Sequence, residues 1–516
     1  MPPGWAVHLP PGMAPADVDL HAGGSLPGAF IRAWAADPGR VTLSTVDGAR
    51  VTAAELEERT GLAALRYAAA GLVPGDRVLL CAATSVELVV AYVGALRAGL
   101  VVVPANPGYS ADELVTLARA AAPALGVLDD PSRLSTLDIP VTTTALESLP
   151  RRGSGLVLDT AQVDDTALLI YTSGTTGRPK GVPLSHGNLL AGAHAVRLAW
   201  RWTPDDTLAL CLPLFHMHGL GVGLHGTLVT GASARLMPFS PAEVASAVAA
   251  GASMFFGVPT MYHRLAESPH LAALAPLRLA VSGSAPLPAE LHAAIREGSG
   301  QVVLERYGMS ETVMLTSNPY EGERRPGTVG FPMPGVELRL AEREGGVHEI
   351  EVRGPNVISG YLDDPAATAA AFTTDGWFRT GDLGVIDSDG YLTISGRAKE
   401  LIITGGYNVY PREIEELLRT HPAVADAAVA GVPDAQWGER VVAYVVPTSA
   451  DQSTSDVPGT GSGASVVPGA DGELVGELAR WCEQRLVAYK RPREWYVVEA
   501  IPRNALGKIM RHLLTP

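Results

Sequence analysis

The stretch Tyr171-Thr-Ser-Gly-Thr-Thr-Gly-Arg-Pro-Lys-Gly181 decides how the rest of the chain is interpreted. An apolar run over residues 167–170 precedes it and predicts a buried strand, and Ser185 downstream can cap a following helix. Glycines let backbone N–H groups turn toward an anion, hydroxyl side chains add hydrogen-bond donors, and a lysine adds a full positive charge. This composition predicts a phosphate-binding loop, because a solvated Ser/Gly turn would need neither the lysine nor the strand. The predicted phosphate ligands are Thr172, Ser173, Gly174, Thr175, Thr176, Gly177 and Lys180.

The loop does not match the Walker pattern, which requires glycine directly before the lysine and a hydroxyl residue directly after it. Here Pro179 and Gly181 flank Lys180, so an ordinary P-loop ATPase is disfavoured. The stretch instead resembles the phosphate loop of the adenylate-forming superfamily, which includes acyl-CoA synthetases, carrier-protein adenylation domains and luciferases. The resemblance implies that the chain binds ATP with Mg²⁺ at this loop, and it places Thr172 beside the metal ion.

The composition fits a large enzyme. The chain has 516 residues, of which 47% are apolar and 18% charged, so it can bury a large core and should divide into more than one domain. A formal net charge of −15 argues against a general affinity for nucleic acid or anionic membranes. Cys81, Cys211 and Cys482 form no CxxC motif and indicate neither disulfides nor a zinc site. Residues 1–5 lack signal-peptide character and the apolar residues 86–103 include charges, so we expect a soluble cytoplasmic protein.

Helical and strand-like patterns alternate from about Thr52 onward. Strands separated by helices imply a largely parallel sheet with helices on both faces, where ligands collect at the carboxyl ends of the strands. The sequence therefore predicts an α/β fold. The predicted capping-box pairs are Thr52 with Glu55, Thr84 with Glu87 and Ser110 with Glu113, and β-rich runs lie at residues 78–81, 100–104 and 125–128.

Residues 212–226 contain two misleading patterns. Three glycines spell GxGxxG, but no clear strand precedes them and no acidic residue follows about 20 positions on, so we interpret them as packing points in a helix rather than a dinucleotide site. His216, His218 and His225 lack a carboxylate or cysteine at metal-ligand spacing, which favours packing histidines. The superfamily resemblance assigns a role to His216 alone, as the gate for the substrate carboxylate between the nucleotide and acyl pockets.

Glu305-Arg-Tyr-Gly-Met-Ser-Glu311 is a second motif whose chemistry can be inferred from its residues. The Ser310 hydroxyl can bond the α-phosphate, the Glu311 carboxylate can help to hold Mg²⁺, and Tyr307 offers a flat face to adenine. Alone, this pattern would equally fit a surface turn. The resemblance implies a nucleotide-binding role for the whole run and for the small-residue turn that stacks on adenine: Gly283, Ser284, Ala285, Glu305, Arg306, Tyr307, Gly308, Met309 and Ser310.

A third cluster precedes a change in the character of the chain. Asp382 could accept both hydroxyls of a ribose, although by itself it would equally fit a turn aspartate. The resemblance implies a ribose contact for Asp382, a ribose and phosphate contact for Arg397, and a hinge at Lys399. It divides the chain into a large N-terminal domain over residues 1–397 and a small, mobile α+β domain over residues 398–516.

Within the small domain, residues 449–470 are rich in Ser, Gly, Thr and Asp and predict a flexible surface loop, an insertion without catalytic duty. Lys508 would by itself be an exposed lysine near the C-terminus. The resemblance makes it the cation that stabilises the adenylation step, and makes Gly405, Gly406 and Tyr407 the lining of a tunnel for the pantetheine of coenzyme A. The implied mechanism has two half-reactions, acyl-AMP formation and then thioester formation, separated by a hinge rotation. Its predicted catalytic residues are His216, Glu311, Lys399 and Lys508.

Several shorter segments resemble malonyl-CoA synthetases in particular, among them residues 212–219, 256–264, 278–285 and 325–330. A dicarboxylate needs a second anchor, and an arginine can bind a carboxylate through two parallel hydrogen bonds. We expect Arg278 in this role, with Arg264 as the second candidate. The same motifs also serve medium-chain or aromatic acyl-CoA synthetases, enzymes that load an acyl carrier protein, and non-catalytic nucleotide-binding relatives. The predicted substrates are therefore a malonate-like carboxylate, ATP and CoA, for a monomer or dimer.

Overall fold

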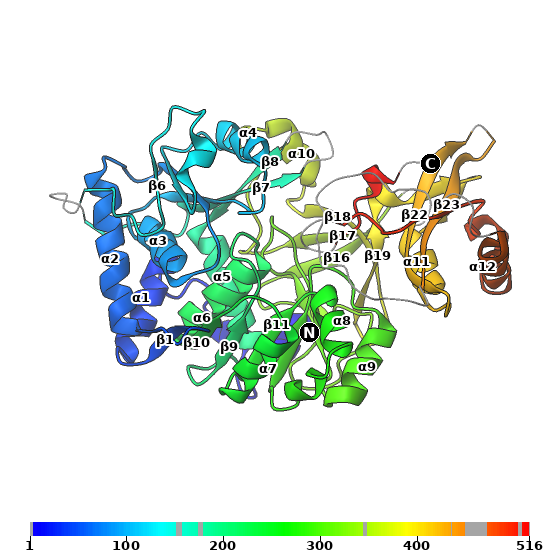
Figure 1. The fold of residues 1–516 in the computed structure, drawn as a ribbon, viewed down its shortest axis with the longest axis horizontal. Helices are drawn as coiled ribbons and strands as arrows, with labels where there is room; N and C mark the ends of the chain where they lie inside the picture. The colour runs from blue at the N-terminus through cyan, green and yellow to red at the C-terminus, as the bar shows by residue number, and fades with distance from the viewer. Residues whose placement is uncertain are drawn as a thin grey trace. The chain divides into compact units, whose positions relative to one another are not determined.

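The computed structural model describes residues 4–150, 157–173, 179–343, 348–434, 436–448, 472–503 and 508–514 (Figure 1). The chain forms two compact units. The N-terminal unit comprises residues 1–338 and 352–378, and the C-terminal unit comprises residues 339–351 and 379–516. The predicted combination of a large α/β part with a smaller C-terminal part is confirmed.

Two largely parallel sheets form the N-terminal unit. In the first, strands β6, β5, β3, β4 and β7 run parallel and β8 closes the edge antiparallel to β7. In the second, β13, β12, β11, β9, β10 and β1 run parallel, and short antiparallel strands border them on both sides. In spatial order the first sheet is β6 (Val141–Thr142), β5 (Leu125–Leu128), β3 (Arg77–Cys81), β4 (Val101–Pro104), β7 (Thr166–Ser173) and β8 (Pro179–Ser185). The second is β15 (Phe331–Pro332), β14 (Thr316–Ser317), β13 (Leu304–Tyr307), β12 (Leu279–Ser282), β11 (Met254–Gly257), β9 (Thr207–Leu210), β10 (Ser233–Leu236), β1 (Val41–Thr45) and β2 (Arg50–Thr52).

Capped helices connect these strands. Thr52 and Ser110 each form the predicted capping box with the glutamate three residues on, whereas α3 begins after Ser85 rather than Thr84, because the Ser85 hydroxyl accepts from the Leu88 N–H. The helices are α1 (Leu26–Ala36), α2 (Ala53–Ala69), α3 (Val86–Arg97), α4 (Ala111–Ala121), α5 (His186–Ala199), α6 (His225–Thr230), α7 (Pro241–Ala249), α8 (Pro259–Ala266), α9 (Ala289–Ser299) and α10 (Pro365–Ala371).

Burial of apolar side chains fixes the helices on the sheets. Helices α7, α8 and α9 lie beside the second sheet (Figure 1) and share a core with it that includes Val244, Phe255, Tyr262 and Ile295. The first sheet has its own core, in which Leu79 and Val103 of the strands contact Leu114 and Leu117 of α4. The glycine-rich run lies in a π-helix over His218–Leu224 that continues into α6, as its interpretation as a packing helix predicted.

The C-terminal unit contains the predicted α+β elements. A sheet of β21 (Tyr407–Val409), β20 (Ile402–Thr404), β23 (Gly438–Pro447), β22 (Val424–Asp434) and β24 (Glu494–Val497) packs against α11 (Pro411–Arg419) and α12 (Gly472–Arg485). A second sheet has the order β16 (Glu337–Glu342), β17 (His348–Arg353), β18 (Phe378–Ile386) and β19 (Leu392–Arg397). The insertion expected at residues 449–470 lies outside the described residues.

The compact units divide the chain at a different place from the expected domain boundary. Most of the β16–β19 sheet groups with the C-terminal elements, so residues 379–397 belong to the C-terminal unit. A physical link is the Arg412 side chain of α11, whose Nη1 donates to the Ile394 carbonyl of β19 at 2.6 Å. Lys399 therefore lies inside the C-terminal unit, in the short 3-10 helix Ala398–Glu400, and its role as a hinge stays a prediction.

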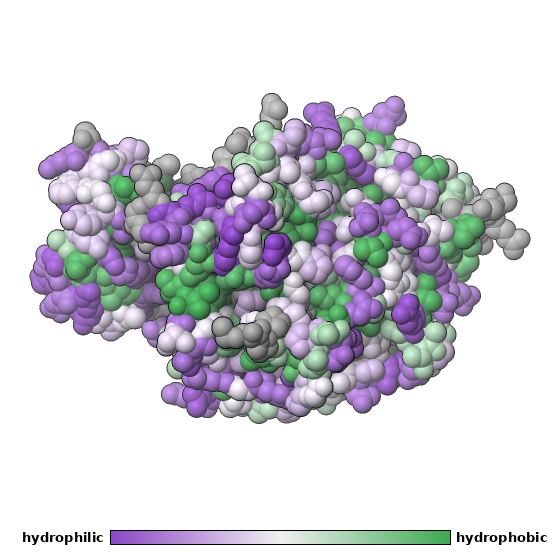
Figure 2. Space-filling view, turned by 180° about the vertical axis from the view of Figure 1, so that it is seen from behind, coloured by the Kyte–Doolittle hydropathy of each residue, from purple (hydrophilic) through white to green (hydrophobic). Residues whose placement is uncertain are grey.

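Figure 2 shows hydrophilic and hydrophobic residues interspersed over one face of the molecule. Across the described residues, no helix combines the length and apolar character needed to cross a bilayer. Cys81, Cys211 and Cys482 are free cysteines, and burial raises the pKa of Cys211 to about 12.

Gly226→Ala should lower the free energy of unfolding of the N-terminal unit by about 1–3 kcal/mol, because the added methyl group would overlap the buried ring of Trp202. Gly61→Ala in α2 is the matched control, since its methyl group would make an ordinary contact at 3.5 Å from Arg97 Nη1. Alanine there should be neutral or stabilise the helix by up to about 1 kcal/mol. Urea denaturation followed by tryptophan fluorescence compares the two variants, and equal effects would contradict the packing role of Gly226.

Candidate active site

Four parallel strands bring the sequence motifs to one edge of the second sheet. Strands β9, β11, β12 and β13 pair in parallel, so their carboxyl ends meet at the same edge. The loop with His216 follows β9, the turn Gly283–Ala285 follows β12, and Ser310 and Glu311 follow β13. The fold therefore gathers the predicted gate, adenine turn and phosphate contacts at one place in the N-terminal unit.

The phosphate loop connects β7 and β8 rather than a strand and a helix. Thr172 and Lys180 are cross-strand partners in the antiparallel pair, and the chain continues as β8 until Ser185 caps α5. The predicted ligands Gly174, Thr175, Thr176 and Gly177 lie outside the described residues, as does the side chain of Ser173. The hairpin places the charge of Lys180 at the end of β7, which is where the sequence predicted a cation.

Tyr361 joins the two nucleotide motifs. Its ring centroid lies 5.1 Å from Lys180 Nζ, and its hydroxyl donates to Glu311 Oε1 at 3.2 Å. The Leu362 N–H donates to the Gly181 carbonyl at 2.9 Å, which holds this segment on β8. Glu311 is only 7% exposed. Tyr361 could not be found from the sequence, because a single tyrosine in a segment without a motif gives no local signal for these long-range contacts.

The Glu305 carboxylate holds two loops around the second motif, and its expected part in nucleotide binding stays a prediction. Its carboxylate accepts from the Gly327 N–H at 2.8 Å and from the Leu287 N–H at 3.3 Å. Gly308 is required by close packing, because a side chain there would overlap the Val313 carbonyl. These contacts fix the end of β13, where Tyr307 is the last residue and Ser310 and Glu311 follow in the next loop.

Arg306 is a buried cation beside the adenine turn. It is 6% exposed, burial lowers its pKa to about 9, and its Nε and Nη2 have no hydrogen-bond partner among the described residues. A Cβ atom on Gly283 would overlap its guanidinium, so the glycine lets Arg306 approach the turn. The resemblance assigned Arg306 to nucleotide binding. With no partner for its Nε and Nη2 in the described part of the chain, this buried cation suits an anionic ligand.

The three histidines have separate environments. His216 is half-buried and its ring lies 4.4 Å from that of Phe215. His218 Nδ1 lies 3.3 Å from Ser284 Oγ, and burial together with the charge of Arg306 holds the pKa of His218 well below its ordinary value. His225 Nε2 lies 2.6 Å from the Tyr92 hydroxyl. No group of three metal-ligating side chains forms within the described ranges.

Arg278 lies at the wrong end of its strand for the expected anchor role. It precedes β12, whereas Gly283 follows it, and five extended residues span roughly 16 Å. Its guanidinium binds both carboxylate oxygens of Asp206, at 2.5 and 2.6 Å, and donates to the Trp200 carbonyl. This position conflicts with the expectation that Arg278 binds the substrate. Arg264 is exposed on α8, with its guanidinium 5.3 Å from the ring centroid of Phe239.

The C-terminal unit contains the other predicted site residues. Asp382 and Arg397 are cross-strand partners in β18 and β19, with the Arg397 Nε 3.0 Å from the buried Asp382 carboxylate. Gly405 and Gly406 both have positive φ, at +58° and +80°, and Gly405 packs against Trp437 so closely that a Cβ atom would lie 2.9 Å from the indole. Tyr407 is exposed and stacks on Tyr489.

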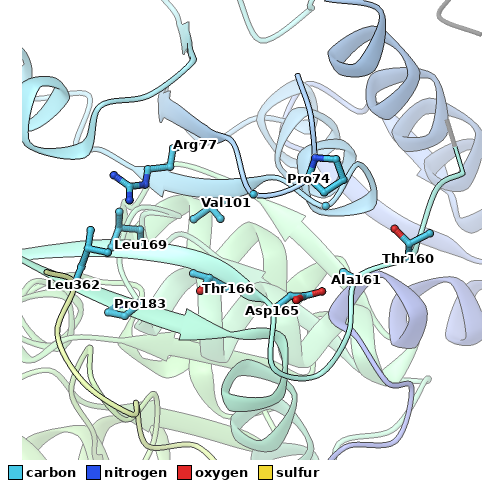
Figure 3. A pocket seen from close by; sticks show the side chains of 12 residues that line it. Pro74, Arg77, Val101, Thr160, Ala161, Asp165, Thr166, Leu169, Pro183 and Leu362 are labelled. Atoms are coloured by element: carbon cyan, nitrogen blue, oxygen red, sulfur yellow. The ribbon is translucent and has the colours of Figure 1, made fainter. Parts of the chain in front are cut away.

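A pocket elsewhere in the N-terminal unit contains none of the predicted site residues. Its volume is about 370 Å³, and Figure 3 shows the side chains that line it. Arg77, Val101 and Thr166 are the first residues of β3, β4 and β7, so the pocket lies at the amino ends of these strands. Ligands of open α/β sheets bind at the carboxyl ends, so we do not assign this pocket to the active site.

Comparison with known proteins agrees with this geometry. Residues 30–362 match the model of the AMP-binding enzyme family, and residues 413–508 match that of the AMP-binding enzyme C-terminal domain. The chain is 37% identical over 493 residues to a sulfoacetate–CoA ligase from Cupriavidus necator, covering 91% of this chain and 93% of that protein. It is 35% identical over 507 residues to the mitochondrial malonate–CoA ligase ACSF3 from Bos taurus, covering 86% of this chain and 82% of that protein.

The crystal structure of ATP-bound MatB from Rhodopseudomonas palustris shares the fold, with a TM-score of 0.84 and 37% identity over 95% of this chain and 98% of that chain. The matches cover both the large and the small parts of the chain. They agree with the convergence of the motifs at the carboxyl ends of β9, β12 and β13. The chain therefore belongs to the AMP-binding enzyme family and is an ATP-dependent acyl-CoA ligase of the adenylate-forming superfamily, close to the malonyl-CoA synthetases.

Proposed function

We propose that this ligase activates a short acid that carries a second anionic group, with malonate or methylmalonate as its substrate. The observation that carries the proposal is Arg306, a buried cation with open donors at the edge where the nucleotide motifs meet. The names of two relatives support the same chemistry, because malonate and sulfoacetate are both short acids with a second acid group.

Burying a charge without a counter-ion costs free energy. A buried guanidinium without an anion loses its hydration and gains little in return, unless a partner arrives. A carboxylate can accept two parallel hydrogen bonds from one guanidinium, which matches the open Nε and Nη2 of Arg306. A second carboxylate of the substrate would supply this partner, and a monocarboxylate would leave the arginine unpaired.

The other residues divide into those that bind ATP and those that serve each half-reaction. We assign Lys180 to the phosphates, Ser310 to the α-phosphate, Tyr307 and the Gly283–Ala285 turn to adenine, Asp382 with Arg397 to the ribose, and His216 to the reacting carboxylate. Lys508 stabilises charge during acyl-AMP formation, and the Gly405–Tyr407 face lines the path of the CoA thiol.

The residues near the phosphate loop suit Mg²⁺. The Glu311 carboxylate and the Thr172 hydroxyl are hard oxygen donors, and Mg²⁺ takes one or two protein ligands together with phosphate oxygens and water. When bound, the ion would neutralise charge on the phosphates. The Tyr361 hydroxyl orients Glu311 for this role by its hydrogen bond to Oε1. The expected cytoplasmic location, the choice of CoA over a carrier protein and the oligomeric state stay predictions.

The substrate assignment predicts the outcome of a panel assay. ATP- and CoA-dependent AMP release should be at least about 100-fold more efficient, in kcat/KM, with malonate or methylmalonate than with acetate, butyrate, octanoate or benzoate, since only the former pair with the buried cation. Oxalate and sulfoacetate test the length and charge of the second group. A monocarboxylate that leads the panel would contradict the proposal, and acyl transfer to a carrier protein but not to CoA would identify the alternative acceptor.

Arg306→Met should lower kcat/KM for malonate by about 100-fold or more while changing that for butyrate much less. Because the substitution removes a buried charge without an acidic partner, the free energy of unfolding should stay unchanged or rise by up to about 3 kcal/mol. Arg264→Met is the matched control on α8, and denaturant titration accompanies the kinetics. A selective loss in the Arg264 variant alone would transfer the anchor role to that residue.

Lys508→Ala should lower the rate of acyl-AMP formation by about 1,000-fold yet leave thioester formation from a supplied acyl-adenylate within about two-fold of the unsubstituted enzyme. The reason is that the charge of the lysine is needed only while the carboxylate attacks the α-phosphate. Pyrophosphate release without CoA measures the first half-reaction, and CoA thioester formation measures the second. Equal loss in both would refute the division of roles between the two half-reactions.

A further inference from the structure

The segment that bears Lys508 is closed into a loop by its own backbone. Arg503 and Ile509 form an antiparallel bridge, and the Met510 N–H donates to the Pro502 carbonyl at 2.8 Å. Lys508 directly precedes this bridge and its side chain is exposed. The direction of the lysine therefore depends on how the two ends of the loop are held.

Arg511 holds the C-terminal end of the loop against two carboxylates. Its Nη1 lies 2.7 Å from Glu400 Oε2, its Nη2 lies 2.6 Å from Glu415 Oε1, and its Nε donates to the Val429 carbonyl at 3.1 Å. The planar guanidinium is well suited to such a fork, because its donors point in fixed directions. One side chain thus fixes the backbone three residues beyond Lys508 to three separate segments of the C-terminal unit.

Glu415 and Glu400 tie Arg511 to different parts of the C-terminal unit. Glu415 of α11 is 4% exposed and also accepts from the Val429 N–H at 2.9 Å, so it ties Arg511 to the core of the unit. Glu400 ends the 3-10 helix Ala398–Glu400, directly after Lys399. Arg511 therefore links the lysine-bearing loop to the segment in which the hinge is predicted.

A second ion pair holds the other end of the loop. Arg503 Nη2 lies 2.7 Å from Asp426 Oδ2, and Asp426 Oδ1 also accepts from Arg419 Nε of α11 at 3.1 Å. Both ends of the loop are thus fixed by arginines whose acidic partners lie on α11, on β22 or beside Lys399. Every partner follows Lys399 in the chain, so a rotation about that residue would leave these contacts in place.

We propose that Arg511 is a positioning residue for Lys508, which sets the direction of the lysine by binding Glu400 and Glu415 together, so that residues 508–511 move with these two carboxylates as one body. The proposal rests on the role assigned to Lys508 under the proposed function. It predicts that Arg511 acts on acyl-AMP formation alone, because thioester formation does not use the lysine.

The test uses the full-length enzyme and measures each half-reaction separately. Arg511→Lys keeps the positive charge beside the buried Glu415 but cannot reach both carboxylates, and Glu400→Gln removes the negative charge of the half-buried arm of the fork. The kcat of acyl-AMP formation should fall by about 10-fold or more in Arg511→Lys and several-fold in Glu400→Gln, with the KM for ATP unchanged and thioester formation within about two-fold. Arg491→Lys is the matched control, because Arg491 of the same unit donates only to the Leu486 and Glu483 carbonyls in the described structure.

The double variant Arg511→Lys/Lys508→Ala separates positioning from a general structural effect. If Arg511 acts through Lys508, the double variant should be no slower in acyl-AMP formation than Lys508→Ala, whereas independent effects would multiply. Equal losses in both half-reactions, or multiplying losses, would overturn the inference. If Lys508→Ala retains acyl-AMP formation, the role of Lys508 fails. If Lys508→Ala loses it and Arg511→Lys does not, only the positioning role fails.

Discussion

The parallel pairing of β9, β11, β12 and β13 is the constraint on which the candidate site depends. Because these paired strands all end at the same edge, loops that are distant in sequence lie close together in space. The pairing is stabilised by a core of side chains such as Phe255 and Tyr262, which lies against α7, α8 and α9. The site residues themselves add little to that core. The fold can therefore hold a rigid edge while the loops at it carry polar and charged groups.

Much of the fold could be predicted from local patterns. Helix caps and short apolar runs act over a few residues, so the sequence alone indicates where such elements begin. Examples are the caps at Thr52, Ser110 and Ser185 and the apolar runs of β3 and β5. The shift from Thr84 to Ser85 shows the limit of such patterns, since two adjacent hydroxyl residues can compete for one cap. The family motifs added the functional interpretation, and the comparisons agree with it at the level of the acyl-CoA ligase.

Side-chain partners over long distances could not be predicted in this way. Arg278 looked suitable because its strand leads to the adenine turn, but strand direction places it at the opposite end, where Asp206 binds it. Tyr361 gave no signal at all, although it contacts both Lys180 and Glu311. The burial of Arg306 could not be predicted from the sequence either, because a charged residue in a motif gives no indication of which neighbours surround it. These properties arise from packing, which a one-dimensional pattern does not contain.

The absence of a side chain at Gly283 has a consequence for how such enzymes diversify. Any larger residue at this position would occupy the space of the Arg306 guanidinium, so positions 283 and 306 cannot change independently. Replacement of the arginine by a smaller residue would have to come first. Among relatives, positions 283 and 306 should therefore covary, and lineages that abandon Arg306 would gain freedom in the adenine turn as a by-product.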